Sequence, residues 1–173
     1  YPDNIEFQLM RSRIRFELEE TPQTAIKRFK SELDGDNLAP DASRYGLALA
    51  YSSAGQFEAA RTALKPLLDK DPNRITYLIM SVDIDVAAER FKPALEILET
   101  QLKLNPENYP LNIRYAEASM KAGLYKQSAE LLERYSRKRK NDDYLWYLLA
   151  EVNGLSGDIL GVHEARAEYF IAN

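Results

Sequence analysis

The strongest constraint on this chain is a pattern that recurs every 34 residues. When the sequence is written in rows of 34 that begin at Asp41, Ile75, Tyr109 and Asp143, equivalent row positions carry similar residues without any gap. A fixed period of this length is typical of helix-turn-helix repeats, because each hairpin buries its apolar face only against its neighbours. The sequence therefore predicts an all-α protein, a right-handed superhelix of stacked helical hairpins.

Three row positions mark the parts of each predicted hairpin. Position eight is small, as close packing of two helices requires, and holds Ala48, Val82, Ala116 and Ala150. Position fifteen, just past the first helix, holds Gly55, Glu89, Gly123 and Gly157. Position seventeen opens the second helix and holds Phe57, Phe91, Tyr125 and Ile159. Because glycine adopts a left-handed conformation at no steric cost, the stretches AGQF and AGLY are predicted to be turns between helices.

The repeat continues less regularly toward both ends of the chain. We expect one domain over residues 1–173, with a divergent repeat at about 6–40 and further repeats at 41–74, 75–108, 109–142 and 143–173, the last one incomplete. Residues 159–173 fit either the second helix of the last row or the first helix of a further row. The further row is favoured, because Ala167 and Phe170 then take positions eight and eleven, and it implies a partner helix beyond Asn173.

Composition and charge exclude several classes of protein. A share of 45% hydrophobic and 29% charged residues is ordinary for a folded protein, and the net charge of −4 disfavours a nucleic-acid binder, which needs a clustered basic surface. The absence of cysteine excludes disulfides, thiolate zinc sites and cysteine nucleophiles. No apolar run approaches the roughly 18 residues that a membrane span needs.

No catalytic constellation is evident in the sequence. The only histidine, His163, begins the stretch HEAR, but Ala167 stands where the zinc-protease motif H-E-x-x-H needs its second ligand. We therefore expect this chain to carry no catalytic residue, no metal site and no cofactor. The one basic cluster, SRKRK at 136–140, is interpreted as a solvated helix end, and docking on an acidic partner is the alternative.

Arrays of helical hairpins bind partners mainly on their concave face, which row positions two, five, nine, twelve and thirteen line. Position five holds Tyr45, Ile79, Ile113 and Tyr147, and position nine holds Leu49, Asp83, Glu117 and Glu151. These residues predict an apolar groove with an acidic stripe, suited to an extended polypeptide, although the acids could equally form a plain solvated face. Phe91, at the edge of a turn, is a further candidate contact, with hinge packing as the alternative.

The second row departs from the pattern at several positions. Glu89 replaces the turn glycine, and Asp85 stands where the first row has Tyr51. Together with Asp83 in the predicted groove, these departures mark the place where we expect a partner to bind.

The row positions resemble those of the tetratricopeptide repeat family. In addition, the segments YPDNIEFQLMRSRIRFEL, LLDKDPNRITYLI and SGDILGVHEARAEYFIAN are similar to the C-terminal region of periplasmic zinc metalloproteases of the β-barrel-assembly-enhancing type. This resemblance implies a periplasmic protein whose zinc lies in a catalytic domain upstream of Tyr1. It also implies that the array docks client outer-membrane β-barrel proteins, including the lipopolysaccharide-transport porin, the barrel assembly machinery and its own protease domain. A stand-alone scaffold or co-chaperone unrelated to proteolysis is the alternative.

Overall fold

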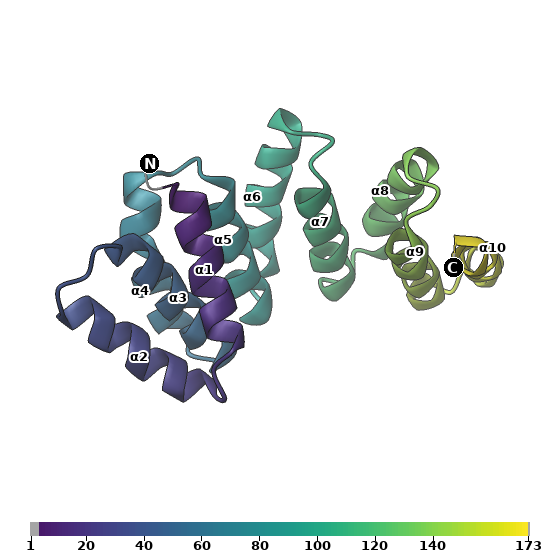
Figure 1. Ribbon diagram of the computed structural model, residues 1–173. Helices are drawn as coiled ribbons and strands as arrows, with labels where there is room; N and C mark the ends of the chain where they lie inside the picture. Colours follow the sequence, from purple (N-terminus) through teal and green to yellow (C-terminus); the bar gives the residue numbers. More distant parts are fainter. Residues whose placement is uncertain (1–3, 173) are drawn as a thin grey trace. The chain divides into compact units, whose positions relative to one another are not determined.

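Helices make up nearly all of the structure, a computed structural model that describes residues 4–172 apart from the side chains of residues 159, 160 and 172. The elements are α1 (Ile5–Glu17), α2 (Pro22–Asp34), α3 (Pro40–Ser53), α4 (Phe57–Lys70), α5 (Ile75–Ala87), α6 (Phe91–Leu104), α7 (Tyr109–Lys121), α8 (Tyr125–Lys138), α9 (Asp143–Ser156) and α10 (Ile159–Ala172) (Figure 1). No strand occurs among the described residues. The all-α prediction is confirmed. None of the helices described is both long and apolar enough to cross a bilayer.

The turn inside each hairpin follows one backbone pattern. Gly55, Gly123 and Gly157 have φ angles of 72°, 76° and 80°, in the left-handed region, so the predicted turns at AGQF and AGLY are confirmed. Glu89 occupies the same row position and has a φ of 58°, although its side chain disfavours that conformation. In all four rows the N–H at position sixteen donates to the carbonyl at position eleven, at 2.7–2.9 Å. This shared bond holds Glu89 in the glycine conformation.

The same turn settles the register of the last helix. After Gly157, the Asp158 N–H donates to the Asn153 carbonyl at 2.8 Å, and α10 then folds back to pack against α9. Its first residue, Ile159, stands at row position seventeen, where α4, α6 and α8 also begin. Helix α10 is therefore the second helix of its row, and the register favoured from Ala167 and Phe170 is wrong.

Small side chains let α3 approach α4 closely, and α7 approach α8. Ala48, Val82 and Ala116 at position eight are at most 1% exposed. Position twenty holds Ala60, Ala94 and Ser128, which are also fully buried. Where that position carries serine, its hydroxyl donates to the Ala116 carbonyl at 2.9 Å, so the polar group is satisfied inside the hairpin.

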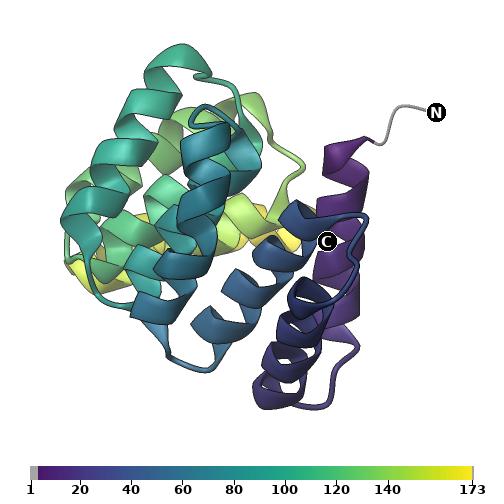
Figure 2. The ribbon, with the colours of Figure 1, turned by 90° about the vertical axis from the view of Figure 1, so that its left-hand side faces the viewer.

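Contacts divide the chain into two compact units, Tyr1–Arg90 and Phe91–Asn173, called here the first and the second unit. In the first unit, α1 runs alongside α3 (Figures 1 and 2), and Leu9 joins Tyr45 and Leu64 in one buried cluster. In the second unit the core lies between α7, α8 and α9. The predicted single domain over residues 1–173 stays a prediction.

Candidate partner-binding surface

Three of the nine residues predicted for the groove lie instead in the hydrophobic core. Tyr45, Leu49 and Ile113 are only 2%, 8% and 6% exposed, so their assignment to a binding surface was wrong. The reason is that neighbouring helices cover them. The Tyr45 ring lies 6.5 Å from that of Tyr77 on α5, and its hydroxyl accepts a 2.8 Å hydrogen bond from Arg13 on α1.

Three other predicted residues are half-buried. Ile79 and Asp83 lie on α5 in the first unit, and Phe91 is the first residue of α6 in the second unit. Their roles in partner binding stay predictions.

The remaining three residues, Glu117, Tyr147 and Glu151, come together around one hollow of about 410 Å³ in the second unit. We call it the α7–α9 hollow after the helices that form it. Its complete lining is Glu117, Met120, Lys121, Tyr144, Tyr147, Leu148, Glu151 and Leu155. With one exception, Leu148 at position six, these residues stand at row positions two, five, nine, twelve and thirteen. The rule that these positions form a concave surface therefore holds between α7 and α9.

Aromatic side chains form the exposed apolar part of this hollow. The rings of Tyr144 and Tyr147 stack with centroids 6.2 Å apart and planes at 14°. Tyr147 is 50% exposed and Leu155 is 51% exposed. Large apolar groups left this open beside one another are typical of a surface that contacts a partner.

Two carboxylates flank the aromatic pair. The Tyr144 hydroxyl donates a 2.5 Å hydrogen bond to Glu117, which holds the ring across from α7 to α9. This bond, followed by burial, raises the pKa of the Tyr144 phenol. Glu151 is exposed and forms no ion pair with a described residue, so its carboxylate is open to a ligand.

Reasoning from the sequence missed Tyr144 and Leu155. Tyr144 stands at row position two and Leu155 at row position thirteen, and the repeat places both positions on the concave face. The predicted groove residues were taken only from positions five and nine. The signal was therefore present in the sequence. What it could not supply was the stacking of Tyr144 on Tyr147, which depends on side-chain rotamers.

Asp85, one of the departures in the second row, has a structural role. The Asp85 side chain is only 7% exposed, and one of its oxygens accepts hydrogen bonds at 2.8–3.2 Å from the guanidinium groups of Arg61 and Arg90. A buried carboxylate needs such partners, since an isolated buried charge is very costly. The expectation that Asp85 marks a partner site was wrong.

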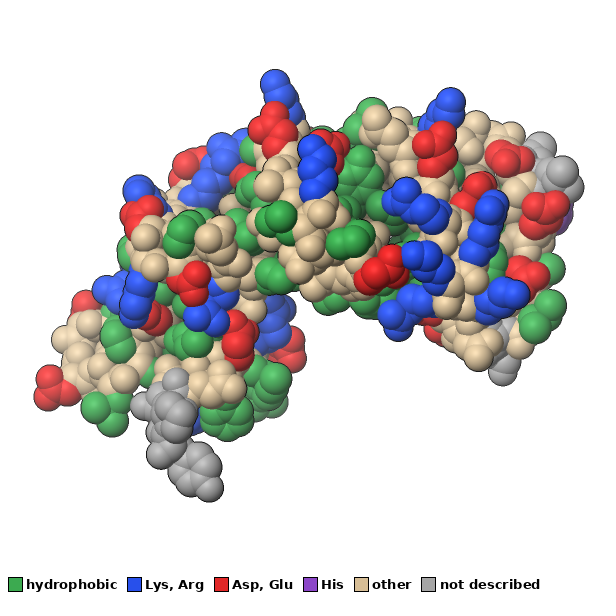
Figure 3. Space-filling view, turned by 90° about the horizontal axis from the view of Figure 1, so that it is seen from above, with side chains coloured by type: hydrophobic (Ala, Val, Ile, Leu, Met, Phe, Trp, Pro, Cys, Tyr) green, Lys and Arg blue, Asp and Glu red, His purple; other side chains and the backbone are tan. Residues whose placement is uncertain are grey.

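Two residues of the basic run at 136–140 make contacts with other residues of the second unit. Lys138 pairs with Glu107 at 2.6 Å, and the Arg139 guanidinium lies 4.5 Å from the centre of the Tyr109 ring. Figure 3 shows Lys and Arg side chains gathered over the second unit.

Within the described part of the chain, no group of three or more His, Cys, Asp or Glu side chains could hold a metal ion. His163 is exposed on α10.

Comparisons with known proteins agree with this architecture. The tetratricopeptide repeat model matches residues 85–152. A solved tetratricopeptide repeat protein from Parabacteroides merdae superposes with a TM-score of 0.77 at 17% identity, over 99% of this chain and 66% of that one. The predicted tetratricopeptide repeat fold is confirmed, and it is the fold of a protein-interaction module.

Sequence relatives point to one kind of protein. The chain is 32% identical over 129 residues to the β-barrel assembly-enhancing protease of Escherichia coli K12, covering 73% of this chain and 26% of that protein. It is 28% identical over 116 residues to the protein of the same name from Yersinia pestis, covering 67% and 24%. The resemblance expected from the terminal segments is confirmed. The chain spans about a quarter of the length of these relatives.

Proposed function

We propose that this tetratricopeptide repeat chain, a relative of the β-barrel assembly-enhancing proteases, binds extended polypeptide segments in the α7–α9 hollow. The observation that carries the proposal is the exposed, stacked pair of Tyr144 and Tyr147 between the carboxylates of Glu117 and Glu151. Aromatic rings provide a large apolar contact that loses little rotamer entropy on binding. The carboxylates add acceptors for backbone N–H groups and attraction for basic side chains.

The clients that fit this surface are outer-membrane β-barrel proteins before they fold. Their strands alternate apolar and polar side chains along an extended backbone, and an unfolded strand offers unpaired N–H groups. A hollow with aromatic rings beside carboxylates matches both features. The relatives' name, which joins β-barrel assembly to proteolysis, supports this choice.

The proposal extends to the whole protein by resemblance. There the array would dock clients, the barrel assembly machinery and its own protease domain in the periplasm. By the same resemblance, the zinc of that protease would lie in its catalytic domain. Reading the gene upstream of Tyr1 separates this proposal from a stand-alone scaffold, since only the former requires an H-E-x-x-H domain.

Fluorescence anisotropy with a labelled ten-residue peptide, taken from one strand of an outer-membrane β-barrel protein, tests the proposal. We expect Glu151→Lys to weaken binding of a peptide carrying two lysines by about fivefold, because one attraction becomes a repulsion. Glu96→Lys on α6 makes the same charge change at an exposed residue outside the hollow and should leave the affinity unchanged. Equal affinities for the two variants would contradict the proposal.

A further inference from the structure

A second hollow in the same unit is unrelated to the groove positions. It lies between α8 and α10, has α9 as its floor and encloses about 550 Å³. We call it the α8–α10 hollow. Trp146, Leu149 and Asn153 of α9 line its floor, and Arg137 of α8 and Glu168 of α10 are among the residues on its walls.

One polar group on the floor lacks a partner. Asn153 is only 4% exposed, yet its side-chain amide forms no hydrogen bond with any described residue. Buried amides are normally hydrogen-bonded. The amide lines the hollow, so a bound molecule could supply the missing partner.

A glycine within α10 lies directly beside this amide. A Cβ atom built on Gly161 would lie 2.5 Å from Asn153 Nδ2, closer than real contacts allow. Glycine inside a helix is destabilising relative to alanine. Glycine at position 161 therefore permits the α10 backbone to pack closely against the Asn153 side chain at the edge of the hollow.

Charges around the hollow are mostly negative. The acidic residues on its lining are Glu133, Asp158, Glu164 and Glu168, and Arg137 is the only basic one, which leaves a net charge of 1 − 4 = −3. Within the described chain, none of the three glutamates takes part in an ion pair. Their carboxylates are exposed and free to attract a cation.

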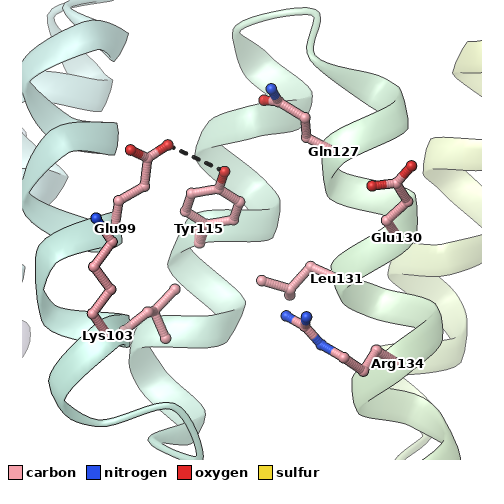
Figure 4. A pocket seen from close by; sticks show the side chains of 8 residues that line it. Glu99, Lys103, Tyr115, Gln127, Glu130, Leu131 and Arg134 are labelled. Carbon is pink, nitrogen blue, oxygen red and sulfur yellow. Dashed lines mark hydrogen bonds between the residues drawn. The ribbon is translucent and has the colours of Figure 1, made fainter.

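The equivalent hollow one row earlier, between α6 and α8, shows that this charge is not a general feature of the repeat (Figure 4). There Gln127 takes the place of Gly161 and Arg134 that of Glu168. The acids Glu99 and Glu130 are balanced by Lys103 and Arg134, so the lining is neutral. Tyr115 donates a 3.4 Å hydrogen bond to one of these acids across the hollow.

We propose that the α8–α10 hollow is a second polypeptide site, which binds an extended segment bearing a lysine or arginine. The cationic side chain would lie between Glu164 and Glu168, near the face of Trp146, where carboxylates and an indole ring both attract a positive charge. The Asn153 amide would pair with a peptide group of the segment. This inference is independent of the α7–α9 hollow and goes beyond the function proposed for it.

Amide NMR of the ¹⁵N-labelled chain tests this site with two blocked peptides, Gly-Lys-Gly-Lys-Gly and Gly-Glu-Gly-Glu-Gly. We expect the lysine peptide to shift the Asn153 side-chain and Gly161 backbone signals, and the glutamate peptide to leave both in place. Glu168→Arg should weaken the lysine peptide at least about fivefold. Arg134→Glu, the opposite exchange at the equivalent position one row earlier, should leave affinity at the α8–α10 hollow unchanged.

Three outcomes would overturn the inference. The first is the absence of shifts at Asn153 and Gly161 with the lysine peptide. The second is equal affinity in wild type and Glu168→Arg, when both spectra show a folded chain. The third is a set of shifts confined to Tyr144 and Tyr147, which would assign basic segments to the α7–α9 hollow and leave the function proposed there intact.

Discussion

The Tyr144 hydroxyl donates a 2.5 Å hydrogen bond to the Glu117 carboxylate and so links α9 to α7 across the candidate binding surface. Because one partner is charged and the pair is partly exposed, we expect the bond to contribute about 1 kcal/mol. Tyr144→Phe should lower the free energy of unfolding by that amount in urea denaturation. Tyr147→Phe is the matched control, since its hydroxyl has no bond to a described residue, and should change stability by less than about 0.5 kcal/mol.

Glu89 holds a backbone conformation that three other rows give to glycine. With φ at 58°, its side chain imposes strain that glycine would relieve, partly offset by the greater freedom of glycine in the unfolded chain. We expect Glu89→Gly to stabilise the protein by about 0.5–1 kcal/mol in thermal unfolding.

The reverse change at an equivalent position checks the cause. Gly123 has a φ of 76°, and a Cβ placed there would meet nothing within 4 Å, so only backbone strain should act. Gly123→Ala should therefore destabilise by about 1 kcal/mol. Unchanged stability in either variant would show that the left-handed turn carries no strain.

Asp85 is the buried centre of an ion cluster that it forms with Arg61 and Arg90 in the first unit. Removing the carboxylate leaves the guanidinium groups of Arg61 and Arg90 with only the exposed Glu58 as an ion-pair partner, so we expect Asp85→Ala to cost about 2 kcal/mol of unfolding free energy. The pair of Lys65 and Asp69, at 2.7 Å and well exposed, is the control. Asp69→Ala should cost less than about 0.5 kcal/mol, and a similar loss in both variants would contradict a special role for burial.

How far the sequence could predict these features depends on how local their causes are. The 34-residue period predicted the hairpins, because small residues permit close packing of adjacent helices and glycine permits the turn between them. Both effects involve only residues close in the sequence. It misplaced Tyr45 and Ile113, because equivalent row positions have unequal neighbours. Ile113 packs with Leu145 and Leu148 of the following α9, whereas Tyr147 has no later first helix beside it in the described chain.

The charged departures show a second limit. An aspartate at a core position cannot be explained from the row pattern until its ion-pair partners are known. One partner of Asp85, Arg61, lies 24 residues earlier in the chain. Likewise, the close contact between the Asn153 amide and Gly161 depends on how α10 packs against α9. Both depend on contacts between helices that the row pattern does not encode.

Alkaline pH should destabilise the second unit through Tyr109. Burial, followed by the neighbouring Asp142, raises the pKa of this phenol from 10.0 to about 12. Below pH 10 both folded and unfolded states keep the proton, so stability is unaffected. Between pH 10 and about 12 the unfolded state loses its proton first, and stability falls.

Urea denaturation between pH 9 and pH 12 measures this loss of stability. The tyrosine phenol of the unfolded chain is taken to have the usual pKa of about 10. Tyr109→Phe should lose stability less steeply than the wild type over that interval. Parallel curves for the two proteins would show that Tyr109 ionises equally in the folded and unfolded states.

Site-specific photocrosslinking tests most directly whether the α7–α9 hollow contacts client polypeptides. A photoreactive phenylalanine analogue would replace Tyr147 in the hollow or, as control, Thr100, an exposed residue of α6 outside it. Each full chain would be mixed with an unfolded outer-membrane β-barrel protein. We predict crosslinks from position 147 that Glu151→Lys reduces, and few from position 100. Equal crosslinking from the two positions, or none from position 147 in a folded chain, would contradict binding in this hollow.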